Sequence, residues 1–69
     1  MELKFVESKN IIAMGYDDDT QTMAVQFKGG KVYHYHHVPR DLYETVRDAP
    51  SIGREFAYSI RDQFDGVLQ

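Results

Sequence analysis

Residues 22–39 read TMAVQFKGGKVYHYHHVP, and this stretch decides the fold of the chain. Apolar and polar side chains alternate over residues 22–27, which is typical of a strand with one buried face. Gly29 and Gly30 follow, and a glycine pair between two strand-like runs predicts a β-hairpin. We expect residues 31–36 to form the second strand of that hairpin.

The length of the hairpin loop decides which side chains share a face, since a shift of one residue reverses every side chain. With a two-residue loop, Val25 shares its face with His34, and Tyr33 and Tyr35 lie on the opposite face. With a three-residue, bulged loop, Val25 lies opposite Tyr33, and His34 and His36 turn to the other face. We favour the bulged loop, because it places the tyrosines with the apolar residues of the preceding strand.

One further strand is predicted before the hairpin. Residues 10–16, NIIAMGY, form this strand after a short lead-in around Phe5 and Val6. Residues 17–21, DDDTQ, are turn-favouring and separate it from the next strand. The three consecutive antiparallel strands make a β-meander.

The periodicity becomes helical after Pro39, whose fixed φ and missing N–H suit the first turn of a helix. The apolar residues of this helix are Leu42, Tyr43, Val46 and Ala49. Pro50 ends the helix, and Ser51 is placed to cap a second one with its side chain. In the second helix an apolar residue recurs every four positions, at Ile52, Phe56, Ile60 and Phe64.

Two amphipathic helices laid across one face of the meander bury the apolar surfaces of both layers. We therefore predict a two-layer α+β domain with a three-stranded antiparallel meander and two C-terminal helices, in the order β-β-β-α-α. A single domain covering residues 1–69 is the only count that this length allows.

The composition excludes several classes of protein. The chain has no cysteine, which excludes disulfides and thiolate-rich metal sites. Eight Lys and Arg stand against 11 Asp and Glu, so the basic excess of a typical duplex-binding protein is absent. No signal-peptide pattern and no membrane-spanning apolar run is present. We expect a soluble, cytoplasmic protein.

Several spaced segments together resemble the KTSC domain, which is named for the C-terminus of some lysyl-tRNA synthetases. They are GYD at 15–17, MAVQF at 23–27, GGKVYHYHHVP at 29–39, LYETVRDAPSIG at 42–53 and the spacing of Phe56, Ile60 and Arg61. Within them lie a Tyr-x-Tyr motif, here Tyr33 and Tyr35, a Val-Pro exit at Pro39, and an Ala-x-Ser-x-Gly segment with Ser51 and Gly53.

The resemblance covers about residues 8–64 and implies a stand-alone bacterial or phage domain without an established function. Ala57-Tyr58 departs from the family pattern, in which a polar residue is expected after the aromatic one. RNA binding has been proposed for the family because of its fusion to synthetases, which is an association and not a chemical argument.

The histidines raise the question of a metal site, which we do not favour. His34 and His36 project from one strand face, and imidazoles bind zinc, nickel and copper. His37 points the other way, and the spacing indicates no third ligand. The aspartates at 17–19 lack the glycine and the glutamate of an EF-hand loop. No serine lies in a catalytic motif, so we expect no catalytic residue, no metal and no cofactor.

Cationic side chains define a candidate binding surface. It comprises His34, His36, Lys28, Lys31, Arg40, Arg47, Arg54 and Arg61. Proteins that bind single-stranded nucleic acid combine such charges with aromatic rings on an open sheet. Here acidic residues interleave with the arginines, which is typical of an ion-paired helix surface, and the bulged hairpin places the tyrosines in the core.

A protein partner is the interaction that the pattern favours, because a three-stranded meander leaves open edges. We predict a small non-catalytic interaction domain that binds a protein, including host machinery if it is phage-encoded, or a second copy of itself. The alternative is a domain that binds RNA or single-stranded nucleic acid in association with translation. No membrane partner is expected.

Overall fold

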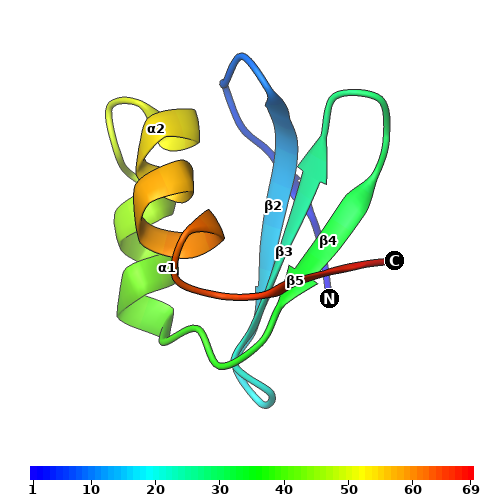
Figure 1. The fold of residues 1–69 in the computed structure, drawn as a ribbon, viewed down its shortest axis with the longest axis vertical. Coiled ribbons are helices and arrows are strands. Elements are labelled where there is room, and N and C mark those ends of the chain that lie inside the picture. Colours follow the sequence, from blue (N-terminus) through cyan, green and yellow to red (C-terminus); the bar gives the residue numbers. More distant parts are fainter.

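The computed structural model describes residues 1–69 and contains one antiparallel sheet of five strands, in the order β1-β2-β3-β4-β5. The strands are β1 (Lys4–Phe5), β2 (Ile11–Asp17), β3 (Thr22–Phe27), β4 (Val32–Tyr35) and β5 (Gly66–Leu68). The helices α1 (Arg40–Arg47) and α2 (Ile52–Phe56) lie on one side of the sheet, and α2 continues as the π-helical segment η1 (Ala57–Arg61) (Figure 1). Both ends of the chain emerge on the side away from the helices.

The β3–β4 hairpin has the three-residue, bulged loop that the sequence favours. Val25 lies opposite Tyr33 in the pairing of the two strands. Gly29 and Gly30 have φ angles of 100° and 95°, in the left-handed region that glycine adopts without a steric penalty. Tyr35 is a member of the buried core cluster, and the partly buried Tyr33 packs against the same cluster. The prediction that the two tyrosines share the core face is therefore confirmed.

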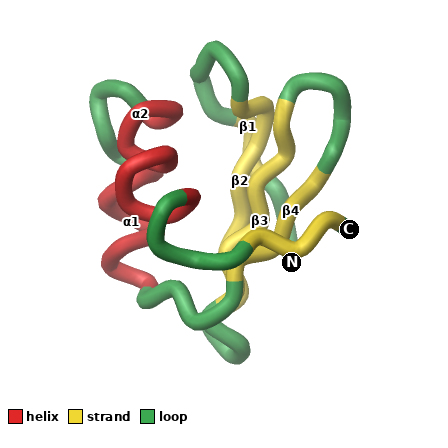
Figure 2. Tube along the Cα trace, viewed as in Figure 1, coloured by secondary structure: helices red, strands yellow, loops and turns green.

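The predicted α+β class with an antiparallel sheet and two helices is confirmed, but the three-stranded meander is wrong, because the sheet has five strands. Strand β1 pairs with β2, with Lys4 opposite Met14 (Figure 2). Strand β5 returns to the sheet after the helices and pairs with β4, with Gly66 opposite Tyr35. Both strands span only two or three residues, which is too short for an alternating pattern to identify them.

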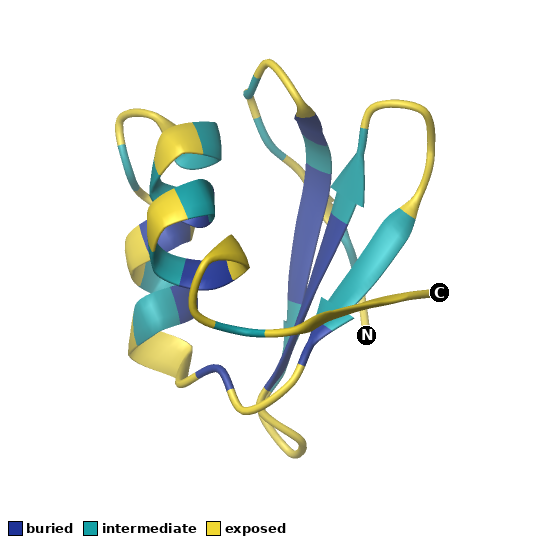
Figure 3. Cartoon of the chain, viewed as in Figure 1, coloured by how far each residue is buried: buried dark blue, intermediate teal, exposed yellow.

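The core lies between the sheet and the helices, where side chains of both layers are buried (Figure 3). Phe56 of α2 packs against Phe27 and Tyr35, with ring centroids 5.5 and 5.4 Å apart and steeply inclined planes. Edge-to-face contacts of this kind are favourable for aromatic rings. The buried cluster comprises Ile11, Met14, Met23, Val25, Tyr35, Val38, Tyr43, Val46, Phe56 and Ile60.

The helices begin close to their predicted starts, but one predicted capping interaction is absent. Pro39 immediately precedes α1, and its C=O accepts a hydrogen bond from the N–H of Tyr43 at 3.1 Å. Ser51 immediately precedes α2, yet its side chain makes no capping hydrogen bond, so that expectation is wrong. Ser51 is exposed, and water can satisfy the N–H groups at an exposed helix start. Neither helix has the length and apolar character that crossing a membrane requires.

Two glycines allow the short outer strands to pack closely on the sheet. A Cβ atom on Gly66 would lie 2.7 Å from the ring of Tyr35, so this ring rests directly on the backbone of β5. A Cβ atom on Gly15 would overlap the carbonyl oxygen of Glu2. Both positions therefore require the absence of a side chain.

We expect Gly66→Ala to lower the free energy of unfolding by about 1–3 kcal/mol, the usual cost of inserting a methyl group into a tight contact. The added Cβ must displace either the Tyr35 ring or strand β5. Urea denaturation measures the loss. Hydrogen exchange of the Gln69 amide, which donates to the C=O of Val32 over 2.8 Å, reports whether β5 detaches.

Val67→Ala is the matched control, because Val67 is the next residue of β5 and is half exposed. It should change the free energy of unfolding by less than about 0.5 kcal/mol. Equal effects of the two variants would contradict a specific contact between Tyr35 and Gly66.

Candidate functional site

A groove lies between the sheet edge at β1 and helix α1. It encloses about 470 Å³, and half of its lining residues are apolar. The lining residues are Glu2, Lys4, Phe5, Val6, Met14, Tyr16, Asp18, Arg40, Tyr43 and Arg47. We call it the β1–α1 groove. Its volume lies within the range of sites that bind small molecules or single side chains.

Two stacked tyrosines form one wall of the groove. The rings of Tyr16 and Tyr43 have centroids 5.0 Å apart and planes inclined by 23°. The hydroxyl of Tyr16 donates a 2.6 Å hydrogen bond to the C=O of Val38, which ties β2 to the segment leading into α1. Tyr43 is buried. The aromatic wall is therefore held rigidly from both elements.

Arg40 and Arg47 flank Tyr43 on one face of α1, because residues three and four positions apart are neighbours on a helix. The guanidinium carbon of Arg40 lies 5.7 Å from the ring centroid of Tyr16. That of Arg47 lies 5.8 Å from the ring centroid of Tyr43. Both distances are within the range of cation–π attraction, so each arginine is stacked on one tyrosine.

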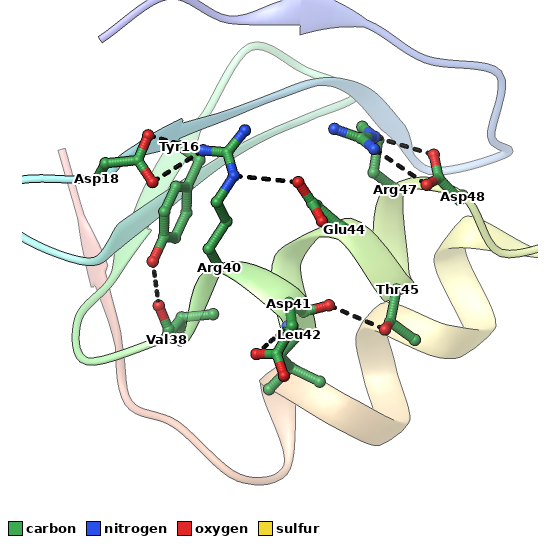
Figure 4. Close-up of polar contacts among 10 residues, drawn as sticks. All are labelled: Tyr16, Asp18, Val38, Arg40, Asp41, Leu42, Glu44, Thr45, Arg47 and Asp48. Carbon is green, nitrogen blue, oxygen red and sulfur yellow. Dashed lines mark hydrogen bonds and ion pairs between the residues drawn. The ribbon is translucent and has the colours of Figure 1, made fainter.

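Acidic side chains orient both guanidinium groups (Figure 4). Asp18 accepts two hydrogen bonds from Nη1 of Arg40, at 2.7 and 2.8 Å, and Glu44 accepts one from its Nε at 3.0 Å. Asp48 accepts hydrogen bonds from Nε and Nη2 of Arg47, at 2.9 and 3.0 Å. Nη2 of Arg40 and Nη1 of Arg47 donate to no protein acceptor, which leaves each guanidinium fixed in place with one free end.

The pKa values of both tyrosines of the groove are raised above the ordinary value. Burial raises the pKa of Tyr16, the carboxylate of Asp18 raises it further, and the guanidinium of Arg40 opposes both. Burial also raises the pKa of Tyr43, against the opposing charge of Arg47. The hydrogen bond from Arg47 lowers the pKa of Asp48. Near neutral pH the aromatic wall is therefore uncharged, while the pair of Arg47 and Asp48 beside it is charged.

Phe5 of β1 lies opposite Ala13 at the rim of the groove, as a pair without hydrogen bonds between the two backbones. Lys4 lies opposite Met14, and the N–H of Val6 donates to the C=O of Ile12 at 3.0 Å. Backbone groups of an antiparallel strand point alternately toward and away from the neighbouring strand. Those of Phe5, which lies between the two paired residues, therefore point away from the sheet. The side chain of Phe5 is 87% exposed.

The cationic residues predicted as one surface lie in separate places. Lys28 and Lys31 flank the tip of the β3–β4 hairpin. Arg54 lines a second, mostly polar cleft beside the start of α2, and Arg61 ends η1. Only the two arginines of α1 from this set line the β1–α1 groove.

His34 and His36 belong to the sheet face opposite the helices, as the bulged loop predicts. His36 places Nδ1 3.2 Å from the hydroxyl of Thr22. No three His, Asp or Glu side chains come together as a metal-binding group. Tyr35 is buried and Tyr33 is half-buried on the helix side, so these rings do not form an open platform for stacking bases.

Sequence reasoning missed most of the groove, including Tyr16, Tyr43, Asp18 and the residues of β1. One signal was available in the sequence. Arg40, Tyr43 and Arg47 have the spacing that places side chains on one face of a helix. The partners of that face come from β1 and β2, and nothing in the sequence specified them.

We expect Tyr16→Phe to lower the free energy of unfolding by about 1 kcal/mol, because it removes one partly buried hydrogen bond and leaves the Val38 C=O without its donor. Urea denaturation measures the change. Tyr58→Phe is the control, since Tyr58 is 75% exposed and its loss of a hydroxyl should cost less than about 0.5 kcal/mol. A Tyr16→Phe protein as stable as the parent would contradict the bond.

We expect the free energy of unfolding to fall as pH rises above about 10, the ordinary tyrosine pKa. Burial raises the pKa of Tyr16, Tyr35 and Tyr43 in the folded chain, so the unfolded chain loses these protons first. Their contribution is fully present below the unfolded pKa and is lost as pH rises through the folded values.

Urea denaturation at a series of pH values from about 8 to about 11 measures this dependence, with tyrosinate absorbance as a second reading. Tyr35→Phe should make the alkaline loss of stability shallower, because one of the three groups is then absent. A midpoint of unfolding that does not change with pH would contradict the predicted shifts.

Relatives of the chain match it over most of its length. A protein of Tsukamurella paurometabola is 37% identical over 62 residues, which cover 90% of this chain and 92% of that protein. An uncharacterized protein of Stutzerimonas stutzeri is 31% identical over 58 residues, which cover 84% and 82%. A lysine–tRNA ligase of Nostoc punctiforme is 36% identical over 58 residues, which cover 84% of this chain and 10% of the ligase.

A solved structure and a family model agree with these matches. The crystal structure of a KTSC domain protein from Yersinia pestis superposes with a TM-score of 0.92 at 30% identity, and covers 99% of this chain and 96% of that one. The model of the KTSC domain matches residues 7–64, close to the range of the resemblance in the sequence. The chain belongs to the KTSC domain family.

Proposed function

We propose that this KTSC domain is a non-catalytic interaction module that binds an extended segment of a protein partner. The segment adds to the edge of β1 as a further strand, and its alternate side chains enter the β1–α1 groove. The observation that carries the proposal is the position of the unpaired Phe5 backbone on the rim of that groove. Addition of a strand beside a groove is a recurring mode of peptide recognition.

The backbone of β1 and the side chains of the groove contribute to binding in different ways. Main-chain hydrogen bonds to Phe5 give affinity that does not depend on the partner's sequence, whereas pockets for alternate side chains give selectivity. The Tyr16–Tyr43 wall and the fixed arginines offer apolar, aromatic and charged contacts for those side chains.

Strand β5 is the second open edge, and it is less suited to selective binding. The N–H of Gln69 donates to the C=O of Val32, so by alternation the backbone of Leu68 points outward. Its side chain is half exposed, but no cavity borders this strand. A second copy of the chain is the partner that such a bare edge fits best.

RNA is the second candidate ligand. It is supported by the similarity to part of a lysine–tRNA ligase and by the free guanidinium ends of α1. The ion pairs of Arg40 and Arg47 with Asp18 and Asp48 weigh against it, because counterion release requires cations that are free to neutralise phosphates. Titration with tRNA at low salt, read by amide chemical shifts, separates the two candidates: shifts that centre on α1 and vanish with added salt favour RNA.

Selection of random linear peptides displayed on phage against the immobilised domain tests the main proposal. We expect enriched peptides to bind in solution and to perturb the amide resonance of Phe5. Phe5→Pro removes the outward N–H without breaking a bond to β2, and proline is tolerated on edge strands. We expect it to weaken binding at least about fivefold, the effect of one lost hydrogen bond.

Leu68→Pro is the matched control, because it removes the equivalent outward N–H on the opposite edge. It should leave peptide affinity unchanged. Phe5→Ala keeps the N–H and should retain most of the binding. Comparison with Phe5→Pro therefore separates the contribution of the Phe5 backbone from that of its side chain. Failure to enrich any peptide, or peptides indifferent to Phe5→Pro, would rule out recognition at β1.

A further inference from the structure

The face of β1 that looks into the groove carries a cation without an acidic partner. Lys4 lies opposite Met14 and shares its face of the sheet, and both line the groove. Lys4 is exposed and takes part in none of the ion pairs of the chain. Its ammonium group is therefore available to a ligand.

We infer that the partner strand carries an acidic residue opposite Lys4 and an apolar residue two positions away, opposite Val6. This inference rests on the proposed strand addition at β1 and names the chemistry that the groove selects. It follows from the alternation of side chains, since residues two positions apart on a strand share one face. Side chains directly opposite each other on antiparallel strands are about 5 Å apart at Cβ, close enough to interact.

The backbone of Phe5 sets the register of an added strand. A partner residue that exchanges hydrogen bonds with Phe5 has neighbours directly opposite Lys4 and Val6. Those two neighbours point to the helix side of the sheet, because Lys4 lies opposite the buried Met14 and Val6 packs against the core cluster. The partner side chain that faces Phe5 points to the other side of the sheet and is less constrained.

The charges around the groove favour a carboxylate at the position opposite Lys4. Three cations, Lys4, Arg40 and Arg47, line the groove against two acids, Glu2 and Asp18. Nη2 of Arg40 and Nη1 of Arg47 donate to no protein acceptor. Both oxygens of Asp18 already accept hydrogen bonds from Arg40, so a basic ligand would compete with this arginine for the acid. Opposite charges facing each other across a strand pair are favourable, and like charges are not.

The partner position opposite Val6 favours an apolar side chain. Val6 is half-buried and packs against the core cluster, and Met14 lies beside it in the lining of the groove. A polar side chain would lose water there without a partner, at a cost in free energy. An apolar side chain gains by covering the exposed part of Val6.

The order of the two residues reports the direction of the partner strand. A strand antiparallel to β1 meets Val6 before Lys4, so it reads apolar-x-acidic from its N-terminus. A parallel strand reads acidic-x-apolar. The spacing of two residues also excludes a helical ligand, in which side chains of one face are three or four residues apart.

The test compares phage-displayed random peptides selected on the parent domain with those selected on Lys4→Glu. We expect parent-selected peptides to share an acidic and an apolar residue two positions apart. A synthetic peptide from that set should lose about fivefold in affinity for Lys4→Glu, the effect of one cross-strand charge pair. The same peptide with its acidic residue replaced by lysine should recover the loss on Lys4→Glu.

Lys28→Glu is the matched control, since it reverses the charge of another exposed lysine, at the β3–β4 hairpin. It should leave the affinity unchanged. Two results would overturn the inferred acidic residue while strand addition stands. The enriched peptides could bind at Phe5 but lack that residue, or their affinity could change equally with Lys4→Glu and Lys28→Glu. If no peptide engages Phe5, both the inferred acidic residue and the proposed function fail.

Discussion

The three-residue loop between β3 and β4 is the constraint on which the other layers of the structure depend. Gly29 and Gly30 adopt left-handed conformations that cost other residues free energy. The resulting register aligns Val25 with Tyr33. A loop one residue shorter would turn Tyr33 toward the open face and His34 toward the helices. The core would then contain imidazoles in place of phenol rings, and buried polar groups without partners are costly.

Tyr35, whose position the hairpin register fixes, contacts both the second helix and the last strand. Its ring meets Phe56 of α2 at 5.4 Å and also covers the backbone of Gly66 in β5. One side chain of the hairpin therefore positions both the second helix and the last strand. This explains how a strand of three residues holds its place at the edge of the sheet, since its few backbone bonds are supplemented by an aromatic contact.

The groove arises because α1 packs along β2 while β1 adds one further strand at the edge. The hydrogen bond from Tyr16 to Val38 and the ion pair between Arg40 and Asp18 hold this end of α1 to the sheet. Strand β1 is short, which limits unselective pairing with other chains. Binding at such an edge needs side-chain contacts in addition to backbone bonds, and the groove supplies them.

Local patterns in the sequence determined the hairpin and the two helices, and the preference of tyrosines for the apolar face favoured the three-residue loop over the two-residue one. These features depend on residues close together in the chain, where alternation, glycine and proline act directly. The tertiary structure alone decided the strands β1 and β5 and the assembly of the groove. Arg40 meets Asp18 across 22 positions, and Tyr16 meets Tyr43, only because α1 is packed on β2. That packing is the sum of many weak apolar contacts over the whole core, and no single motif encodes it.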